Sequence, residues 1–384
     1  MISTISGYKA IVIRFWLHFN IALIVFSSYK NPFKVLRILS AIKAKRKNLL
    51  GLQPISRFIK SGRRYFFSDN IPGWPSRAFR GYFRAELIRT SGTNGISVPF
   101  STVFISVSSR CPLRCLHCYE WENLSDRETL SLEQLKDIIN KVKEYGAFHI
   151  QFSGGEPLMR MDDLQILIRY AGDGADVWIN TSGFGLTREK ALLLKKAGLT
   201  GAEISLDHWD EGEHNRFRAN AQAFRWAGEA VKNCNEAGLV TCLSLCTTSS
   251  FVTRENLDKY ADLAMRWGVS FIRVLDPRKT ARFNGQETEL SGAQIQMLED
   301  FFLNASSPGS APNYPIVSYP GYHQRRIGCM GAGNRYIYID PRGEIHACPF
   351  CRGSAGNALT VSIEDTVATL KARGCHQYST FKAE

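Results

Sequence analysis

The sequence predicts an α/β protein whose centre is a partial (β/α)6 barrel of the TIM type, with an N-terminal helical appendage and a C-terminal cysteine-rich module. Three observations lead to this fold class. From about residue 101, six short β-rich runs alternate with segments of helical length, whereas the residues before them are basic and apolar and lack the alternation. After about residue 281 the alternation stops, and cysteines cluster around a hairpin-like segment. We therefore expect three domains, with bounds 1–95, 96–280 and 281–384.

The alternation predicts a parallel sheet covered by helices. Ser131 and Gln134 open one helical segment, SLEQLKDIINKVKEYG, with the spacing of a capping box. Strand and helix units in series form parallel sheets, and barrels of this kind carry their chemistry at the C-terminal ends of the strands. The six predicted strands are FISVS (104–108), FHIQFS (148–153), DVWINT (176–181), GAEISL (201–206), LVTCLSL (239–245) and FIRVL (271–275).

The net charge of +13 belongs to the first quarter of the chain. Up to residue 95 there are 17 Lys and Arg against 2 Asp and Glu, and the remainder has 31 against 33. A cationic segment of this kind seeks an anionic partner, which can be nucleic acid, an acidic protein or an anionic membrane surface. Nucleic acid fits least, because apolar and aromatic residues dominate the neighbours of these charges.

The composition excludes a disordered chain, because 44% of the 384 residues are apolar, which is enough to fill a large core. Ten cysteines fall in uneven clusters within this large chain, and the N-terminus has no convincing cleavage site for secretion. Metal-bound thiolates in a reducing compartment fit this pattern better than disulfides. We therefore expect a cytoplasmic protein.

Residues 10–27 form an apolar run that is long enough to cross a bilayer, but Arg14, His18 and Asn20 raise the cost of crossing. An interfacial helix is favoured slightly over a membrane span, and a buried helix packed on the enzyme is a third interpretation. Residues 31–51 have the pattern of a basic amphipathic helix on a membrane. The predicted location is therefore the inner, cytoplasmic face of a membrane.

Three cysteines follow directly on the first predicted strand, in the segment SRCPLRCLHCYEW. Cys111, Cys115 and Cys118 are spaced by three and two residues, in the loop at the C-terminal end of that strand. Three such thiolates can hold an iron-sulfur cubane and leave one iron open to a cofactor. The alternatives are a zinc site that recruits His117, and buried structural cysteines.

At these residues the sequence resembles the radical S-adenosylmethionine (SAM) superfamily, whose signature has this cysteine spacing and in which a residue such as Tyr119 commonly follows the last cysteine. The resemblance implies a [4Fe-4S] cluster and SAM as cofactors. The second predicted strand ends in QFSGGEPLMR. The resemblance implies that this GGEP element, with Gly154, Gly155 and Glu156, binds the methionine amino group of SAM.

Two further strand ends match the family less closely. The third strand ends in NTSGFGLT, where Ser182 replaces the asparagine of the family's Thr-Asn-Gly turn at an implied cofactor contact. The fourth gives EISLDHWDEGEHNRFRAN, similar to a Ser-Leu-Asp strand end followed by a His-Asp-x-x-Arg stretch. The resemblance implies that Ser205 and Asp207 face the ribose or the substrate and that Arg218 faces a carboxylate. Helix caps and surface ion pairs are simpler roles for these residues.

The tail from GCMGAGNRYIYIDPRGEIHACPF onward resembles the auxiliary-cluster extension called SPASM, or Twitch when it is shortened. The full SPASM pattern has seven cysteines, and one auxiliary [4Fe-4S] cluster is implied here. Its fourth ligand is either the last cysteine or the substrate, and zinc is the alternative metal. The cysteines available in this tail are Cys329, Cys348, Cys351 and Cys375.

The resemblance implies an enzyme that cleaves SAM with an electron from a reductant such as flavodoxin or ferredoxin, and whose 5′-deoxyadenosyl radical abstracts hydrogen from an unactivated carbon. The basic, apolar N-terminus favours a lipid or an envelope-linked small molecule as substrate. One alternative is a maturase that modifies a ribosomally made peptide. Such relatives often carry a folded docking domain ahead of the barrel, and no such pattern is visible before residue 95. The other alternative is a non-catalytic, membrane-attached iron-sulfur electron carrier, against which the GGEP element counts.

Overall fold

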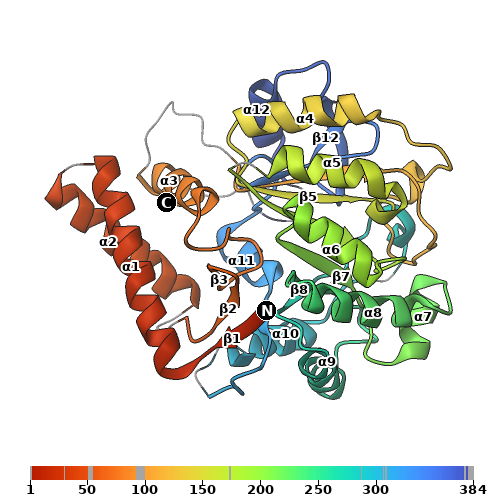
Figure 1. The fold of residues 1–384 in the computed structure, drawn as a ribbon, viewed down its shortest axis with the longest axis horizontal. Helices are drawn as coiled ribbons and strands as arrows, with labels where there is room; N and C mark the ends of the chain where they lie inside the picture. The colour runs from red at the N-terminus through yellow and green to blue at the C-terminus, as the bar shows by residue number, and fades with distance from the viewer. Residues whose placement is uncertain are drawn as a thin grey trace.

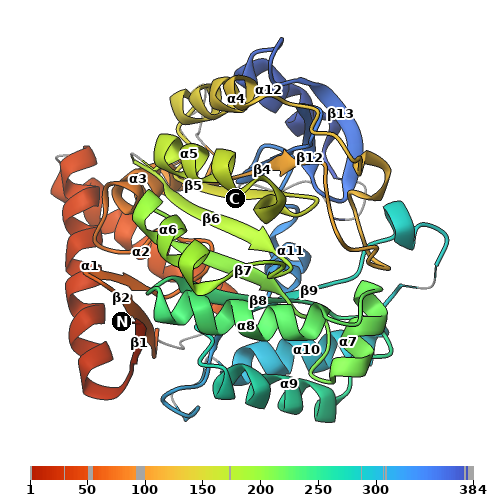
Figure 2. The same cartoon turned by 45° about the vertical axis from the view of Figure 1, so that its right-hand side comes forward.

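Six parallel strands form the centre of the computed structural model, side by side in the order that the sequence predicts (Figures 1 and 2). Ile105 lies opposite Phe152 across the first pair, and each later strand pairs in parallel with the one before it. The predicted partial barrel is therefore confirmed. The strands are β4 (Thr102–Ser108), β5 (His149–Gly154), β6 (Asp176–Thr181), β7 (Gly201–Ser205), β8 (Val240–Cys246) and β9 (Phe271–Leu275). The structure describes residues 2–29, 31–50, 55–91, 100–172, 174–286, 288–305, 307, 309–375 and 378.

Helices between the strands cover the outer face of this sheet (Figures 1 and 2). The predicted capping box is present at the first of them, where the Gln134 backbone N–H donates to Ser131 Oγ at 3.2 Å and the Ser131 N–H donates to Gln134 Oε1 at 2.8 Å. The helices are α4 (Leu132–Glu144), α5 (Met161–Ala171), α6 (Arg188–Ala197), α7 (Glu211–Arg218), α8 (Ala223–Glu236) and α9 (Arg254–Arg266).

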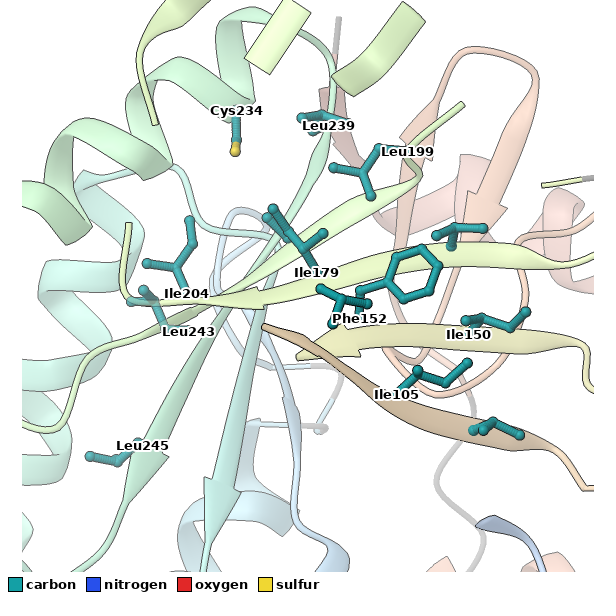
Figure 3. Close-up of a cluster of buried hydrophobic side chains, with 14 of the residues drawn as sticks. Ile105, Ile150, Phe152, Ile179, Leu199, Ile204, Cys234, Leu239, Leu243 and Leu245 are labelled. Atoms are coloured by element: carbon teal, nitrogen blue, oxygen red, sulfur yellow. The ribbon is translucent and has the colours of Figure 1, made fainter. Parts of the chain in front are cut away.

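Residues of the strands alternate between the helices and the barrel interior. The helix-facing side chains are apolar and fully buried, and they form the main core. Between them in sequence, the polar side chains of Asn180, Glu203 and Ser244 line a cavity inside the barrel. A strand places successive side chains on opposite faces of a sheet, so this polar set identifies the interior as a binding surface. The apolar set includes Ile105, Phe152, Ile179, Ile204 and Leu243 (Figure 3).

The C-terminal region continues the same sheet at both edges. One added strand, β10 (Ile316–Ser318), pairs in parallel with β9, and another, β11 (Tyr336–Ile339), pairs in parallel with β4. The predicted hairpin is confirmed, because β12 (Glu344–Cys348) pairs antiparallel with β11, and β13 (Cys351–Asn357) follows it. The domain boundary between residues 280 and 281 stays a prediction. The remaining helices of this region are α10 (Gly292–Ala305), α11 (Pro320–Ile327) and α12 (Ile363–Arg373), and single 3-10 turns lie at 121–123, 157–160 and 281–283.

Residues before the barrel fold into a unit with its own core, in which Leu17, Val25, Phe58 and Phe79 are fully buried. No pattern of a folded docking domain is visible in the sequence before residue 95, and the structure shows that this segment has a core of its own. Its strands have only three or four residues, which is too short for a clear period of two. The predicted boundary between residues 95 and 96 lies outside the described residues. The elements are β1 (Ile2–Ile5), α1 (Gly7–Tyr29), α2 (Pro32–Leu50), β2 (Phe58–Ser61), β3 (Arg64–Phe66) and α3 (Arg77–Ser91), with the strands in one antiparallel sheet.

A buried charge cluster joins this N-terminal unit to the barrel. Arg273 on β9 donates to Asp69 Oδ2 at 2.7 Å and lies 2.5 Å from Glu203 Oε2 on β7. All three side chains are at most 5% exposed. Burial raises the pKa of Glu203, and Arg273 opposes that rise. Removing one member of such a cluster is costly, because the remaining charge then lacks both water and a partner.

Replacing Arg273 is therefore expected to destabilise the protein strongly. Arg273→Met leaves two buried carboxylates and should lower the free energy of unfolding by about 3–5 kcal/mol. Asp69→Asn keeps the pair between Arg273 and Glu203 and should cost about 1–2 kcal/mol. The control is Arg188→Gln, at an exposed pair with Glu236, which should cost less than about 1 kcal/mol. Thermal unfolding midpoints measure this order of stability among the three variants. Equal midpoints for Arg273→Met and Arg188→Gln would contradict the prediction.

Candidate active site

A cavity of about 1520 Å³ lies at the C-terminal ends of the parallel strands, and all the predicted site residues line it. Both sets of cysteines therefore face one space, although more than 200 residues separate Cys118 from Cys329. The N-terminal unit also contributes to the wall, through apolar residues such as Leu17 and Leu39. The predicted residues on the wall are Cys111, Cys115, Cys118, Tyr119, Gly154, Gly155, Glu156, Ser182, Ser205, Asp207, Arg218, Cys329, Cys348, Cys351 and Cys375.

The loop that carries the cysteine triad is held by the end of β5. The backbone N–H of Gly155 donates to the Ser108 carbonyl, and that of Glu156 donates to the Arg110 carbonyl, both at 2.7 Å. A Cβ atom on Gly155 would lie only 2.3 Å from the Arg110 oxygen, and Gly154 has a φ of +134°. Only glycine fits such a conformation and approach. The two glycines therefore let the end of β5 approach the backbone of the cysteine loop closely.

The Glu156 carboxylate links β5 to the end of β6. Its Oε1 accepts from Thr181 Oγ1 at 2.7 Å and from the Leu158 N–H at 3.2 Å. Its Oε2 accepts from the backbone N–H and the hydroxyl of Ser182, at 2.8 and 2.5 Å. Burial raises the pKa of Glu156, and the bonds from Ser182 and Thr181 oppose the rise. Ser182, which replaces the family's asparagine, thus positions Glu156 at the cavity wall.

Arg218 on α7 connects the fourth strand to the triad. Its Nε donates to Asp207 Oδ2 at 2.6 Å, and its Nη1 donates to Cys115 Sγ at 3.5 Å. Both side chains of the ion pair are at most 9% exposed, so the surface ion pair considered from the sequence does not describe it. The Asp207 N–H donates to His214 Nδ1 at 3.0 Å, and burial lowers the pKa of His214 to about 3, so this histidine is neutral.

The three thiols of the triad line the same cavity. Cys115 is buried, while Cys111 and Cys118 pack beside it in the same small apolar cluster. Burial raises the pKa of Cys111 and of Cys118 to about 12, so both thiols keep their protons at neutral pH. A cationic metal group bound beside them would favour the thiolate form. His117 stacks on Phe217 with ring centres 4.8 Å apart, and burial lowers its pKa to about 4. The donor set fits an iron-sulfur cluster with three protein ligands.

The four C-terminal cysteines also meet. The Cys329 thiol contacts Cys375, and Cys351 contacts both Cys348 and Cys375 through sulfur hydrogen bonds. These contacts raise the pKa of Cys329 and of Cys351. Within the described ranges, no group of three or more His, Cys, Asp or Glu side chains is already arranged around a single metal-ion position. The contacts among these four thiols are therefore the observation that fits a second metal group at this place.

Tyr119 lies between the two sets of cysteines. Its ring meets Tyr338 and Phe350 edge-on, with ring centres 5.8 and 6.0 Å away. Burial raises its pKa, so the phenol keeps its proton. The next residue, Glu120, is buried and accepts a hydrogen bond from the Tyr338 hydroxyl. Sequence reasoning missed Glu120, and the one signal for it was a carboxylate directly after the cysteine motif.

Comparisons with known proteins agree with this geometry. A sequence family described as the Radical SAM superfamily matches residues 105–267. The chain is 31% identical over 257 residues to the PqqA peptide cyclase of Streptomyces rochei, which covers 64% of this chain and 68% of that relative. The protein belongs to the radical SAM superfamily. It is therefore an enzyme that uses a [4Fe-4S] cluster and SAM, as the sequence predicted.

Two other relatives of this radical SAM enzyme extend the comparison. Mycofactocin maturase MftC of Mycolicibacterium smegmatis is 28% identical over 278 residues, which is 69% of each chain. The crystal structure of Streptococcus suis SuiB bound to precursor peptide SuiA superposes with a TM-score of 0.58, at 16% identity, over 86% of this chain and 78% of SuiB. That structural likeness supports the fold, including the curled sheet.

The contact between Gly155 and the cysteine loop leads to a testable prediction. Gly155→Ala should push the loop at Arg110 away from β5, lower the free energy of unfolding by about 1–3 kcal/mol and raise the alkylation rate of Cys111. Gly292→Ala is the matched control, because a Cβ there meets open space and no positive φ is required. Mass spectrometry of alkylated peptides from metal-free protein measures the rate. An unchanged rate for Cys111 in Gly155→Ala would show that the contact is not needed.

Proposed function

We propose that this radical SAM enzyme modifies a ribosomally made peptide. The observation that carries the proposal is its similarity to a peptide cyclase and to mycofactocin maturases, over about two thirds of each chain. The sequence alone favoured a lipid or an envelope-linked small molecule, because the N-terminal residues are basic and apolar. The names of the relatives favour the peptide instead, and the folded unit ahead of the barrel removes the argument against it.

In this proposal Cys111, Cys115 and Cys118 hold the [4Fe-4S] cluster. When bound, the cluster and SAM together supply a 5′-deoxyadenosyl radical that removes hydrogen from an unactivated carbon. Glu156 is the acceptor for the amino group of SAM, positioned by its bonds from Thr181 and Ser182. Tyr119, Ser205 and the buried strand ends enclose the remaining wall of the cavity. Excluding water there protects a reactive radical from side reactions.

Cys329, Cys348, Cys351 and Cys375 are proposed to hold one auxiliary [4Fe-4S] cluster. Their contacts with one another support this assignment, and zinc is the alternative outcome. The Tyr119 ring and Phe350, which lies between Cys348 and Cys351 in sequence, separate the two proposed cluster positions. Such an arrangement suits electron transfer between them. A cytoplasmic flavodoxin or ferredoxin is the proposed external reductant.

A lipid substrate is a second candidate, and one observation favours it. The N-terminal unit extends the wall of the cavity with the apolar side chains of Leu17, Ile21, Leu39 and Ile42. An apolar wall of this kind suits an acyl chain, and it equally suits apolar side chains of a peptide. The non-catalytic electron carrier is set aside, because the chain belongs to an enzyme superfamily.

The first test measures iron and 5′-deoxyadenosine in anaerobically reconstituted, reduced protein. We expect about eight iron atoms in the wild type, about four in a Cys111→Ala/Cys115→Ala/Cys118→Ala variant, and 5′-deoxyadenosine release from the wild type alone. Co-expression with each short open reading frame that sequencing finds beside the gene should change the mass of one encoded peptide by loss of hydrogen or by a new cross-link. Release of 5′-deoxyadenosine that depends on lipid extract and on no neighbouring peptide would favour the second candidate. No release at all would reject both.

Arg218 gives a second prediction. A charged hydrogen bond to a ligand sulfur stabilises the reduced cluster, which carries more negative charge. Arg218→Gln should therefore lower the midpoint potential of the triad cluster, by up to about 60 mV if the bond contributes about 1.5 kcal/mol. Arg218→Lys, which keeps the charge, should shift it less. Potentiometric titration followed by electron paramagnetic resonance measures both. Identical potentials in all three proteins would remove Arg218 from this role.

A further inference from the structure

Helix α1 has two apolar faces, and only one of them is covered. On the inner face, Leu17 and Val25 are fully buried and Ala10 is 2% exposed, against α2 and α3 of the N-terminal unit. On the outer face lie six large apolar side chains, and each is between 48% and 64% exposed. We call these six residues the outer stripe: Ile11, Phe15, Trp16, Phe19, Leu23 and Phe26.

The outer stripe contains no charged residue. Arg14, the cation within the apolar run, lies towards the protein body, where its Nη1 donates to the Ile55 carbonyl at 3.2 Å. Phe33 and Leu36, at the start of α2, are 84% and 64% exposed and extend the apolar surface past the turn. An exposed apolar surface of this extent marks a site at which a protein docks to a partner or a membrane.

The charge around the outer stripe indicates what covers it. Residues 1–68 contain 13 Lys and Arg and no Asp or Glu. Lys9 on α1 and Arg37 and Lys43 on α2 are exposed. Two copies of the chain docked through this face would bring like charges together, whereas an anionic phospholipid surface offers opposite charge beside an apolar layer. Exposed Trp and Phe side chains also suit the boundary between headgroups and acyl chains.

The packing of the inner face of α1 decides whether the helix crosses a bilayer or lies along its surface. Among the described residues, α1 is the one helix that is long and apolar enough to cross a bilayer. Crossing would require α1 to leave α2 and α3 and would uncover Leu17, Val25 and the Arg14 bond. Lying in the plane of the interface keeps all of these contacts and buries the outer stripe alone.

We propose that the outer stripe binds the surface of an anionic membrane, with α1 lying in the interface plane, and that it holds the enzyme there. The proposal does not depend on the substrate, because the stripe faces away from the cavity that Leu17 lines. Figure 2 shows α1 along the outer edge of the molecule, on the side opposite α7. The barrel is thereby left free to receive a peptide or a lipid.

Vesicle flotation of the purified full-length protein tests the proposal. Wild type should float with vesicles of phosphatidylcholine and phosphatidylglycerol mixed seven to three, and at least tenfold less with phosphatidylcholine alone. Phe15→Glu/Phe19→Glu should lose at least tenfold of the binding to the anionic vesicles. Leu192→Glu/Tyr170→Glu is the matched control, because it places two acids at exposed apolar residues of α6 and α5, and it should float like the wild type.

Three flotation results would overturn the proposal. They are absence of flotation with anionic vesicles, equal flotation of the stripe variant and the wild type, and equal flotation with neutral and anionic vesicles. Light scattering after gel filtration tests the competing occupant: a wild-type dimer that Phe15→Glu/Phe19→Glu converts to a monomer would assign the stripe to a second copy and also overturn it. Unchanged thermal unfolding midpoints verify that the exposed substitutions leave the fold intact.

Discussion

The short backbone hydrogen bonds between the end of β5 and the cysteine loop are the constraint on which the site depends. Through them, Gly155 and Glu156 fix the height of the loop above the sheet. The Glu156 side chain then ties the same point to β6, and Arg218 reaches from α7 to Cys115. The first two contacts come from strand ends and the third comes from a helix, so the site around the loop is held from several sides. A rigid scaffold of this kind is what a three-ligand metal site requires, because the protein must supply the geometry that a fourth ligand would otherwise impose.

The barrel strands could be predicted from the sequence almost residue by residue, because short β-rich runs alternate with segments of helical length. FIRVL, for example, coincides with β9. The N-terminal unit could not, because its core joins Leu17, Phe58 and Phe79 from separate short elements. Contacts between residues so distant in sequence produce no periodic pattern of apolar residues within any one segment. The predicted triad, GGEP element and tail cysteines do reach one cavity, but the partners of Arg218 and of Glu120 depend on tertiary packing that no motif encodes.

The choice of substrate shows the limit of reasoning from net charge. The positive excess of residues 1–95 led the sequence-based interpretation towards a lipid, yet surface charge describes what a protein approaches and not what its cavity holds. In the structure these two properties belong to opposite faces of one helix. Leu17 and Ile21 of α1 line the cavity, while Phe15 and Phe19 face outward. Location and catalysis are therefore separate questions in this enzyme, even though they share α1.

The parallel pairing of β11 with β4 has a consequence for biosynthesis. The strand that leads into the cysteine triad is made first, and its outer neighbour β11 is made only after the other five parallel strands of the barrel. Until then β4 presents an unpaired edge, which is a template for association with other nascent chains. The sheet therefore cannot be completed strand by strand in the order in which the chain is synthesised. The C-terminal region thus covers the edge of the strand that leads into the cysteine loop, in addition to supplying cysteines to the cavity.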